Sequence, residues 1–180
     1  MNDAVERVLV SEEQLIKRTA ELGAMITRDF QGEDLLLVSV LKGGAVFAMD
    51  LMRKIDLQLK IDFIAVSSYG SSTKSSGIVK IVKDLDYDIH GKSILIVEDI
   101  VDSGLTLSYL KELFLTRGAK DVKIAAILSK PSRRKADIKV DYMGFEIPDE
   151  FVIGYGLDYA DKYRSLPYVG VLKRSIYENE

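Results

Sequence analysis

Two adjacent carboxylates, Glu98 and Asp99, come directly after four branched apolar residues, Ile94 to Val97. Such a continuous apolar run is typical of a strand that is buried on both faces in a parallel sheet. Ligands of open α/β sheets bind at the carboxyl ends of the strands, which is where this pair would lie. Two carboxylates at that place can accept hydrogen bonds from sugar hydroxyls or bind a magnesium ion.

A short polar turn, Asp102 to Thr106, follows the carboxylate pair and leads into the amphipathic run Leu105 to Leu115. Gly104 allows a sharp turn, so the first amide groups of the helix would point at one spot together with the hydroxyls of Ser103 and Thr106. This arrangement predicts an anion site. A phosphate site beside a carboxylate pair fits a ligand that carries a phosphate together with sugar hydroxyls or a magnesium ion.

The simpler alternative is an ordinary strand, turn and helix in which Asp102 or Ser103 caps the helix. A cap accounts for one polar residue at that position, but it does not account for the pair Glu98 and Asp99. The binding site therefore explains more of the segment than the cap does.

The segment Ile94 to Thr106 resembles the phosphoribosyl diphosphate (PRPP) binding signature of the purine phosphoribosyltransferases, in which a strand, an acidic pair, a third aspartate and a hydroxyl-rich turn occur in this order. The resemblance implies that Glu98 and Asp99 bind the ribose hydroxyls or their Mg²⁺. It also implies that Asp102 is the general base, which takes the N7 proton of a purine or hydrogen-bonds to it. The residues of the turn that would bind PRPP are Asp102, Ser103, Gly104, Leu105 and Thr106.

A second short motif, Lys42-Gly43-Gly44, follows the apolar run Leu35 to Val40. Adjacent glycines let the backbone approach a ligand closely, and Lys42 adds a positive charge at the same edge of the sheet. Taken by itself, the motif is also explained by a plain turn between strand and helix. The resemblance implies that this loop binds the pyrophosphate of PRPP, and that the peptide bond from Leu41 to Lys42 is cis.

Residues 145–159 resemble the purine-binding hood of the hypoxanthine-guanine phosphoribosyltransferases of the short bacterial type. The resemblance implies that Phe151 stacks on the base, that Val152 contacts its edge through backbone groups, and that Asp158 binds a second Mg²⁺ or approaches the purine. The alternative is that Phe151 and Val152 are core residues of a short strand.

Two basic residues complete the implied site. Lys130 ends the apolar run 122–128, and the resemblance implies that its ammonium group, which has donors and no acceptor, selects the exocyclic oxygen of a 6-oxopurine. Arg164 corresponds to an arginine that binds pyrophosphate, for which a guanidinium fork is well suited. The neighbouring charges at 133–135 are interpreted as a solvated turn without a role.

The segment Ser67 to Gly77 contains almost no apolar residues, so its burial would contribute little toward ordering it. A mobile lid and a passive hairpin loop fit this composition about equally. The resemblance implies a lid in which Tyr69 covers the transition state and PRPP.

The elements that must position these residues alternate between strand and helix along the chain. A capping box at Ser11 to Gln14 begins a helix that runs to about Phe30, and apolar runs then alternate with amphipathic segments. This order predicts an α/β fold with a mainly parallel, twisted sheet and helices on both faces. The resemblance implies one phosphoribosyltransferase domain over 1–180, with a core at about 30–140 and a small hood formed by the N-terminal segment and residues 141–172.

Composition narrows the class of protein. The chain has no cysteine and a net charge of −3, which argues against disulfides, thiolate chemistry and a general nucleic-acid binder. Without an apolar run long enough for a membrane helix or a secretory signal, we expect a cytoplasmic protein and no membrane partner. The expected activity is transfer of the phosphoribosyl group from PRPP to hypoxanthine or guanine, with Mg²⁺, by a homo-oligomer. The rivals are a regulatory protein that binds PRPP or a nucleotide on the same fold, and a transferase for xanthine.

Overall fold

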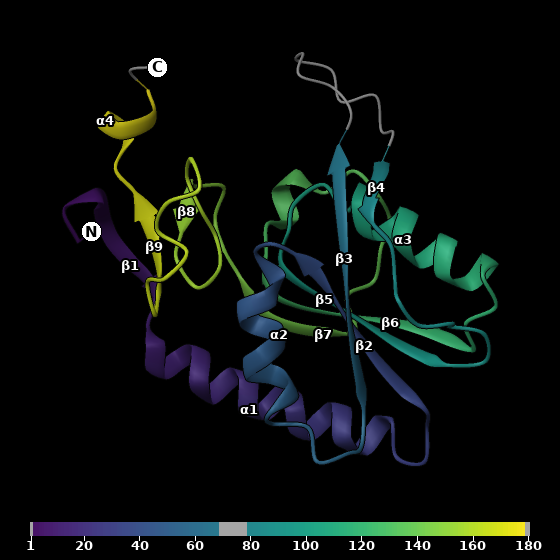
Figure 1. Cartoon of the computed structure of the whole chain (residues 1–180). Coiled ribbons are helices and arrows are strands. Elements are labelled where there is room, and N and C mark those ends of the chain that lie inside the picture. The colour runs from purple at the N-terminus through teal and green to yellow at the C-terminus, as the bar shows by residue number, and fades with distance from the viewer. Residues whose placement is uncertain (1, 69–78, 179–180) are drawn as a thin grey trace.

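A six-stranded sheet with the spatial order β4-β3-β2-β5-β6-β7 forms the centre of the computed structural model, which describes residues 2–68 and 79–178 (Figure 1). All neighbouring strands are parallel except β3 and β4. The strands are β2 (Leu35–Leu41), β3 (Lys60–Ser68), β4 (Val79–Lys83), β5 (Ser93–Val101), β6 (Asp121–Ser129) and β7 (Tyr142–Glu146). The predicted α/β fold with a mainly parallel sheet is confirmed. The predicted lid spans Ser67 to Gly77, and its residues from Tyr69 onward lie outside the described part of the chain.

Helices cover both faces of this sheet, because successive residues of its buried strands alternate between two cores. Leu35 and Leu37 of β2 pack in one core with the first two helices, whereas Leu36 and Val38 pack in the other with the third. The helices are α1 (Glu12–Asp29), α2 (Gly44–Met52) and α3 (Leu105–Thr116).

The first helix begins at the predicted capping box. The hydroxyl of Ser11 accepts a hydrogen bond from the amide of Gln14 at 3.3 Å, and the amide of Ser11 donates to Oε1 of Gln14 at 2.8 Å. The helix ends at Asp29, and Gly32 then adopts a φ of 82° that glycine tolerates better than other residues.

A second, three-stranded sheet brings the two ends of the chain together on the left of Figure 1. Its antiparallel order is β1-β9-β8, with β1 (Val5–Val10), β8 (Val152–Ile153) and β9 (Val169–Leu172). We call this sheet and the loops at 154–168 the hood. Strand β7 pairs with β6 in the larger sheet, so the predicted hood boundary at 141 was too early. A five-residue strand carries no sequence signal that tells which sheet it joins. The remaining short elements are η1 (Asn2–Ala4), η2 (Pro131–Arg133) and α4 (Arg174–Tyr177).

The direction in which strands are added reverses at β2. The chain places β3 on one side of β2 and then returns to place β5 on the other side. The loops that follow β2 and β5 therefore leave the sheet at the same edge and in opposite directions, which opens a crevice at their carboxyl ends. The two polar motifs of the sequence occupy these two loops.

Candidate active site

A cavity of about 360 Å³ lies at the carboxyl ends of β2 and β5. It gathers predicted site residues from both loops and from the hood. Those that line it are Lys42, Gly43, Glu98, Asp99, Asp102, Ser103, Gly104, Thr106, Asp158 and Arg164. Gly44 is the first residue of α2 and Leu105 is the first residue of α3, and neither lines this cavity.

The turn after β5 has the geometry of an anion site rather than that of a side-chain cap. Gly104 is the N-cap of α3, with a φ of 79° and a ψ of −4°, and no side chain makes a capping hydrogen bond. The hydroxyl of Ser103 comes no closer than a long 3.4 Å contact with the amide of Leu105. The start of α3 therefore lies beside the cavity without a side-chain cap on its N-terminus, and such a helix start favours an anion.

The acidic pair lies at the end of β5, half-buried in the wall of the cavity. Loss of hydration raises the pKa of Glu98 well above its usual value, and the neighbouring Asp99 raises it further. Loss of hydration also raises the pKa of Asp99, against hydrogen bonds to its carboxylate that include one from the amide of Ile100 at 2.7 Å. A bound cation would relieve the cost of ionising both groups.

The loop after β2 packs directly against this pair. A side chain at Gly43 would place its Cβ 1.5 Å from Oδ2 of Asp99, and one at Gly44 would come within 2.9 Å of the carbonyl oxygen of Val97. The predicted close backbone approach is thus to β5 itself. The bond between Leu41 and Lys42 is cis, as the resemblance implied.

Asp102 has two carboxylate oxygens in different environments. Oδ2 accepts a hydrogen bond from Arg133 at 3.1 Å, whereas Oδ1 is buried and has no hydrogen-bond partner in the described part of the chain. A buried acceptor that is left free in this way is unusual, because buried polar groups are normally paired. Oδ1 is therefore a candidate acceptor for a proton or hydrogen bond from a ligand.

Arg133 and Lys135 are exposed, as expected for a solvated turn, but two of the basic residues after Lys130 also make specific contacts. Arg133 pairs with Asp102 and lies 3.6 Å from Asp149, and Arg134 donates to the hydroxyl of Ser129 at 2.7 Å. Clusters of charge usually mark exposed loops, so the sequence carried no signal for these contacts.

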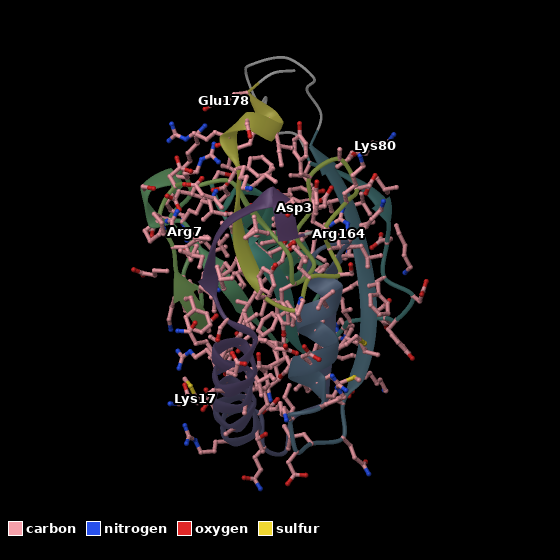
Figure 2. All side chains as sticks on the ribbon, turned by 90° about the vertical axis from the view of Figure 1, so that its left-hand side faces the viewer. Asp3, Arg7, Lys17, Lys80, Arg164 and Glu178 are labelled. Carbon is pink, nitrogen blue, oxygen red and sulfur yellow. The ribbon has the colours of Figure 1, made fainter. Side chains whose placement is uncertain are left out.

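A network of charges joins the hood to the loop after β2. Arg164 lies 2.7 Å from Asp158 and 3.2 Å from Asp161, and Lys42 lies 3.2 Å from the same oxygen of Asp161. Figure 2 shows Arg164 among the loops of the hood. The hydrogen bonds from Lys42 and Arg164 lower the pKa of Asp161, a residue that the sequence did not single out.

Of the residues that the resemblance assigned to the purine, Asp158 lines this cavity, whereas Lys130, Phe151 and Val152 do not. Lys130 is buried, with its ammonium 3.6 Å from Asp149, and Val152 is buried in β8. Phe151 is 39% exposed, stacks on Tyr177 at 5.2 Å between ring centroids and meets Tyr159 edge-on at 5.6 Å. Because of this exposure, Phe151 is not a core residue, unlike its neighbour Val152.

The donor set fits Mg²⁺ of the kind that arrives with a phosphorylated substrate. No group of three or more carboxylate, histidine or cysteine side chains that could hold a metal occurs in the described ranges. Magnesium sites of this kind use one or two carboxylates, waters and substrate phosphates, so Glu98 and Asp99 suffice. Within the same ranges, no helix has the length and apolar character needed to cross a membrane.

Comparison with known proteins finds relatives of the family that the sequence resembles, and these relatives match nearly the whole chain. The family model of the phosphoribosyl transferase domain matches residues 9–160. The hypoxanthine-guanine phosphoribosyltransferase of Bacillus subtilis (strain 168) is 58% identical over 179 residues, 99% of each chain. A crystal structure of a hypoxanthine phosphoribosyltransferase from Staphylococcus aureus has a TM-score of 0.96 at 48% identity, covering 98% of this chain and 96% of that one.

A more distant relative has the same fold. It is the hypoxanthine phosphoribosyl transferase of Trypanosoma cruzi, whose C-terminal region has been studied for a role in oligomeric state and activity. That structure has a TM-score of 0.93 at 39% identity and covers 98% of this chain and 96% of the other.

Proposed function

This chain belongs to the phosphoribosyl transferase family, and we propose that it transfers the 5-phosphoribosyl group of PRPP to hypoxanthine or guanine in purine salvage. The products are IMP or GMP and pyrophosphate. One observation carries the proposal: a single cavity combines a carboxylate pair, a helix-start anion site and the basic residues Lys42 and Arg164. The names of the similar enzymes support the choice of base.

The cavity divides naturally between the two ends of PRPP. The 5-phosphate would bind at the backbone donors of Ser103 to Thr106, and the pyrophosphate would bind between Lys42 and Arg164. The ribose hydroxyls or a Mg²⁺ ion would be held by Glu98 and Asp99, and Asp158 is the candidate for a second Mg²⁺. Asp158 would then share its carboxylate with Arg164, which contacts it at 2.7 Å. Bound Mg²⁺ would supply positive charge against the leaving pyrophosphate.

In the reaction, the bond from C1 of the ribose to the pyrophosphate oxygen breaks and a bond from C1 to N9 of the purine forms. Negative charge grows on the pyrophosphate, where Lys42, the loop amides and Arg164 would stabilise it. The purine loses its N7 proton. The carboxylate of Asp102 would accept this proton or hydrogen-bond to it as charge shifts. Its unpartnered Oδ1 supports this role.

The base would bind on the side of the cavity that leads to Lys130. Asp149 lies 3.6 Å from both Lys130 and Arg133, and Arg133 contacts Asp102, so ion pairs connect the proposed base selector to the proposed general base. Lys130 would donate to the exocyclic oxygen of the purine, Phe151 would stack on its ring and Val152 would meet its edge.

Two other functions on the same fold fit the chain less well. A regulatory protein that binds PRPP or a nucleotide and attaches to RNA would need a basic face, and a net charge of −3 does not favour one. A transferase for xanthine differs in how it accepts the group at position 2 of the base, which backbone groups mostly decide. We further propose a cytoplasmic enzyme that acts as a homo-oligomer, a dimer or a tetramer.

The function is tested by assaying PRPP-dependent nucleotide formation with hypoxanthine, guanine, xanthine, adenine and uracil. We expect turnover with the first two bases that is lost when Mg²⁺ is chelated and restored when it is added back. Turnover confined to xanthine or uracil would contradict the assigned base, and PRPP binding without turnover of any base would favour the regulatory rival.

Replacing Asp102 tests the general base. Asp102→Asn should lower kcat by roughly 10²-fold or more while PRPP binding changes little, because the amide cannot accept the proton. Steady-state kinetics and PRPP titration measure the two effects, with Asp137→Asn, an exposed carboxylate in the loop after Arg133, as the control. A near-normal kcat would remove Asp102 from the mechanism.

Replacing Lys130 tests base selection. Lys130→Ala should weaken the binding of hypoxanthine and guanine by about 1.5–3 kcal/mol, because the buried oxygen loses a charged donor, and should leave PRPP affinity almost unchanged. Lys130→Met, which keeps most of the buried stem, controls for packing. Equal losses for base and PRPP in both variants would show that Lys130 acts on phosphate binding or on folding.

A further inference from the structure

A partly buried hydrogen bond outside the active-site cavity joins the hood to α2. The hydroxyl of Tyr155 donates to Oδ2 of Asp50 at 2.8 Å, and Arg53 donates to the other oxygen of the same carboxylate. Tyr155 is 7% exposed and has a φ of 50°, which is uncommon for a residue with a side chain. Its amide donates to the carbonyl oxygen of Leu166 at 2.9 Å. A residue in this conformation needs strong local contacts to hold it.

The next residue connects the hood to both groups that would bind pyrophosphate. Gly156 has a φ of 99°, and a Cβ there would lie 2.2 Å from the carbonyl oxygen of Gly43. Its carbonyl oxygen accepts a hydrogen bond from Arg164 at 2.7 Å, and its amide donates to the carbonyl oxygen of Arg164 at 3.0 Å. The backbone at Gly156 is therefore in contact with the loop after β2 and with Arg164 at once.

Asp50 and Gly43 belong to one rigid unit, because α2 begins at Gly44, immediately after the loop. The bond from Tyr155 to Asp50 thus joins the hood to the same helix whose first turn carries the pyrophosphate loop. A shift of Tyr155 would change the spacing between Arg164 and Lys42, which meet at Asp161.

We propose that Tyr155 and Asp50 are positioning residues for the pyrophosphate subsite, where their hydrogen bond sets Arg164 against the loop of Lys42 and Gly43. Neither residue lines the cavity at the ends of β2 and β5, so both act through residues that do. The inference rests on the proposed function, and it names residues to which the resemblance gave no role.

The hydroxyl of Tyr155 stays a donor throughout the physiological range. Burial raises its pKa, and the hydrogen bond to Asp50 raises it further. Titration of the tyrosine therefore does not break this hydrogen bond in that range.

The chain offers a matched control for removing this hydroxyl. Tyr142 in β7 also donates to a carboxylate, Oδ2 of Asp29 in α1, at the same 2.8 Å, and burial also raises its pKa. Tyr142 and Asp29 join α1 to the edge of the larger sheet and do not line the cavity. Tyr155→Phe and Tyr142→Phe each remove one such hydrogen bond and keep the ring.

Both variants should lower the Tm by a similar few degrees, because each loses one partly buried hydrogen bond. Tyr155→Phe should in addition raise the KM for PRPP and the Kd for magnesium pyrophosphate by about 5- to 10-fold, with the KM for hypoxanthine changed far less. Amide exchange in residues 154–164 should become faster in Tyr155→Phe and not in Tyr142→Phe. Asp50→Asn keeps an acceptor oxygen and should restore most of the PRPP affinity that Asp50→Ala loses.

A Tyr155→Phe enzyme with wild-type KM for PRPP and unchanged exchange at 154–164 would overturn the inference. So would equal changes in PRPP affinity in both tyrosine variants. A wild-type protein that is folded but neither binds pyrophosphate nor turns over PRPP would overturn the proposed function, and this inference with it.

Discussion

The contact between Gly43 and Asp99 is the constraint on which the site depends. Two loops from adjacent parallel strands can form one cavity only if nothing separates them, and a Cβ at Gly43 would lie 1.5 Å from the carboxylate of Asp99. The reversal of strand order at β2 brings the loops to the same edge, and the missing side chain lets them touch. The hood repeats this solution at Gly156, where a Cβ would lie 2.2 Å from the carbonyl oxygen of Gly43.

Charge is arranged around this contact in a consistent way. Asp102 and Asp158 each have an arginine partner, Arg133 and Arg164, within 3.1 Å. By contrast, within residues 2–68 and 79–178 no lysine or arginine forms an ion pair with Glu98 or Asp99. Partial burial raises the pKa of both carboxyl groups, with Arg164 opposing the rise at Asp99, so a cation bound at the pair would favour their ionised forms. This supports the assignment of Mg²⁺ to Glu98 and Asp99.

Much of the fold could be predicted from the sequence, because its local signals agree. The capping box at Ser11, the fully apolar run of β2 and the strand-turn-helix at residues 94–115 each determine one element, and the alternation of strands and helices determines the sheet. The start of the hood could not be predicted, since a strand as short as β7 has no pattern that distinguishes one sheet from another.

The residues that line the cavity were predictable where type and local position are enough to place them, as for Glu98, Asp102 and Gly104. Contacts between side chains of distant segments were not predictable. Arg133, Asp161 and Tyr155 make their contacts across 31, 119 and 105 positions of the sequence. Charged and aromatic residues of this kind are usually surface or core residues, and only the folded chain distinguishes them.

The most direct test of this account is the affinity of Gly43→Ala for magnesium pyrophosphate, measured by calorimetry. Gly43 has a φ of −61° and a ψ of −43°, so alanine is compatible with the backbone there and the substitution isolates the clash with Asp99. We predict a folded protein whose affinity falls at least tenfold, about 1.4 kcal/mol, because the loop or the carboxylate must move. A folded variant that binds magnesium pyrophosphate as tightly as the wild type would contradict the account.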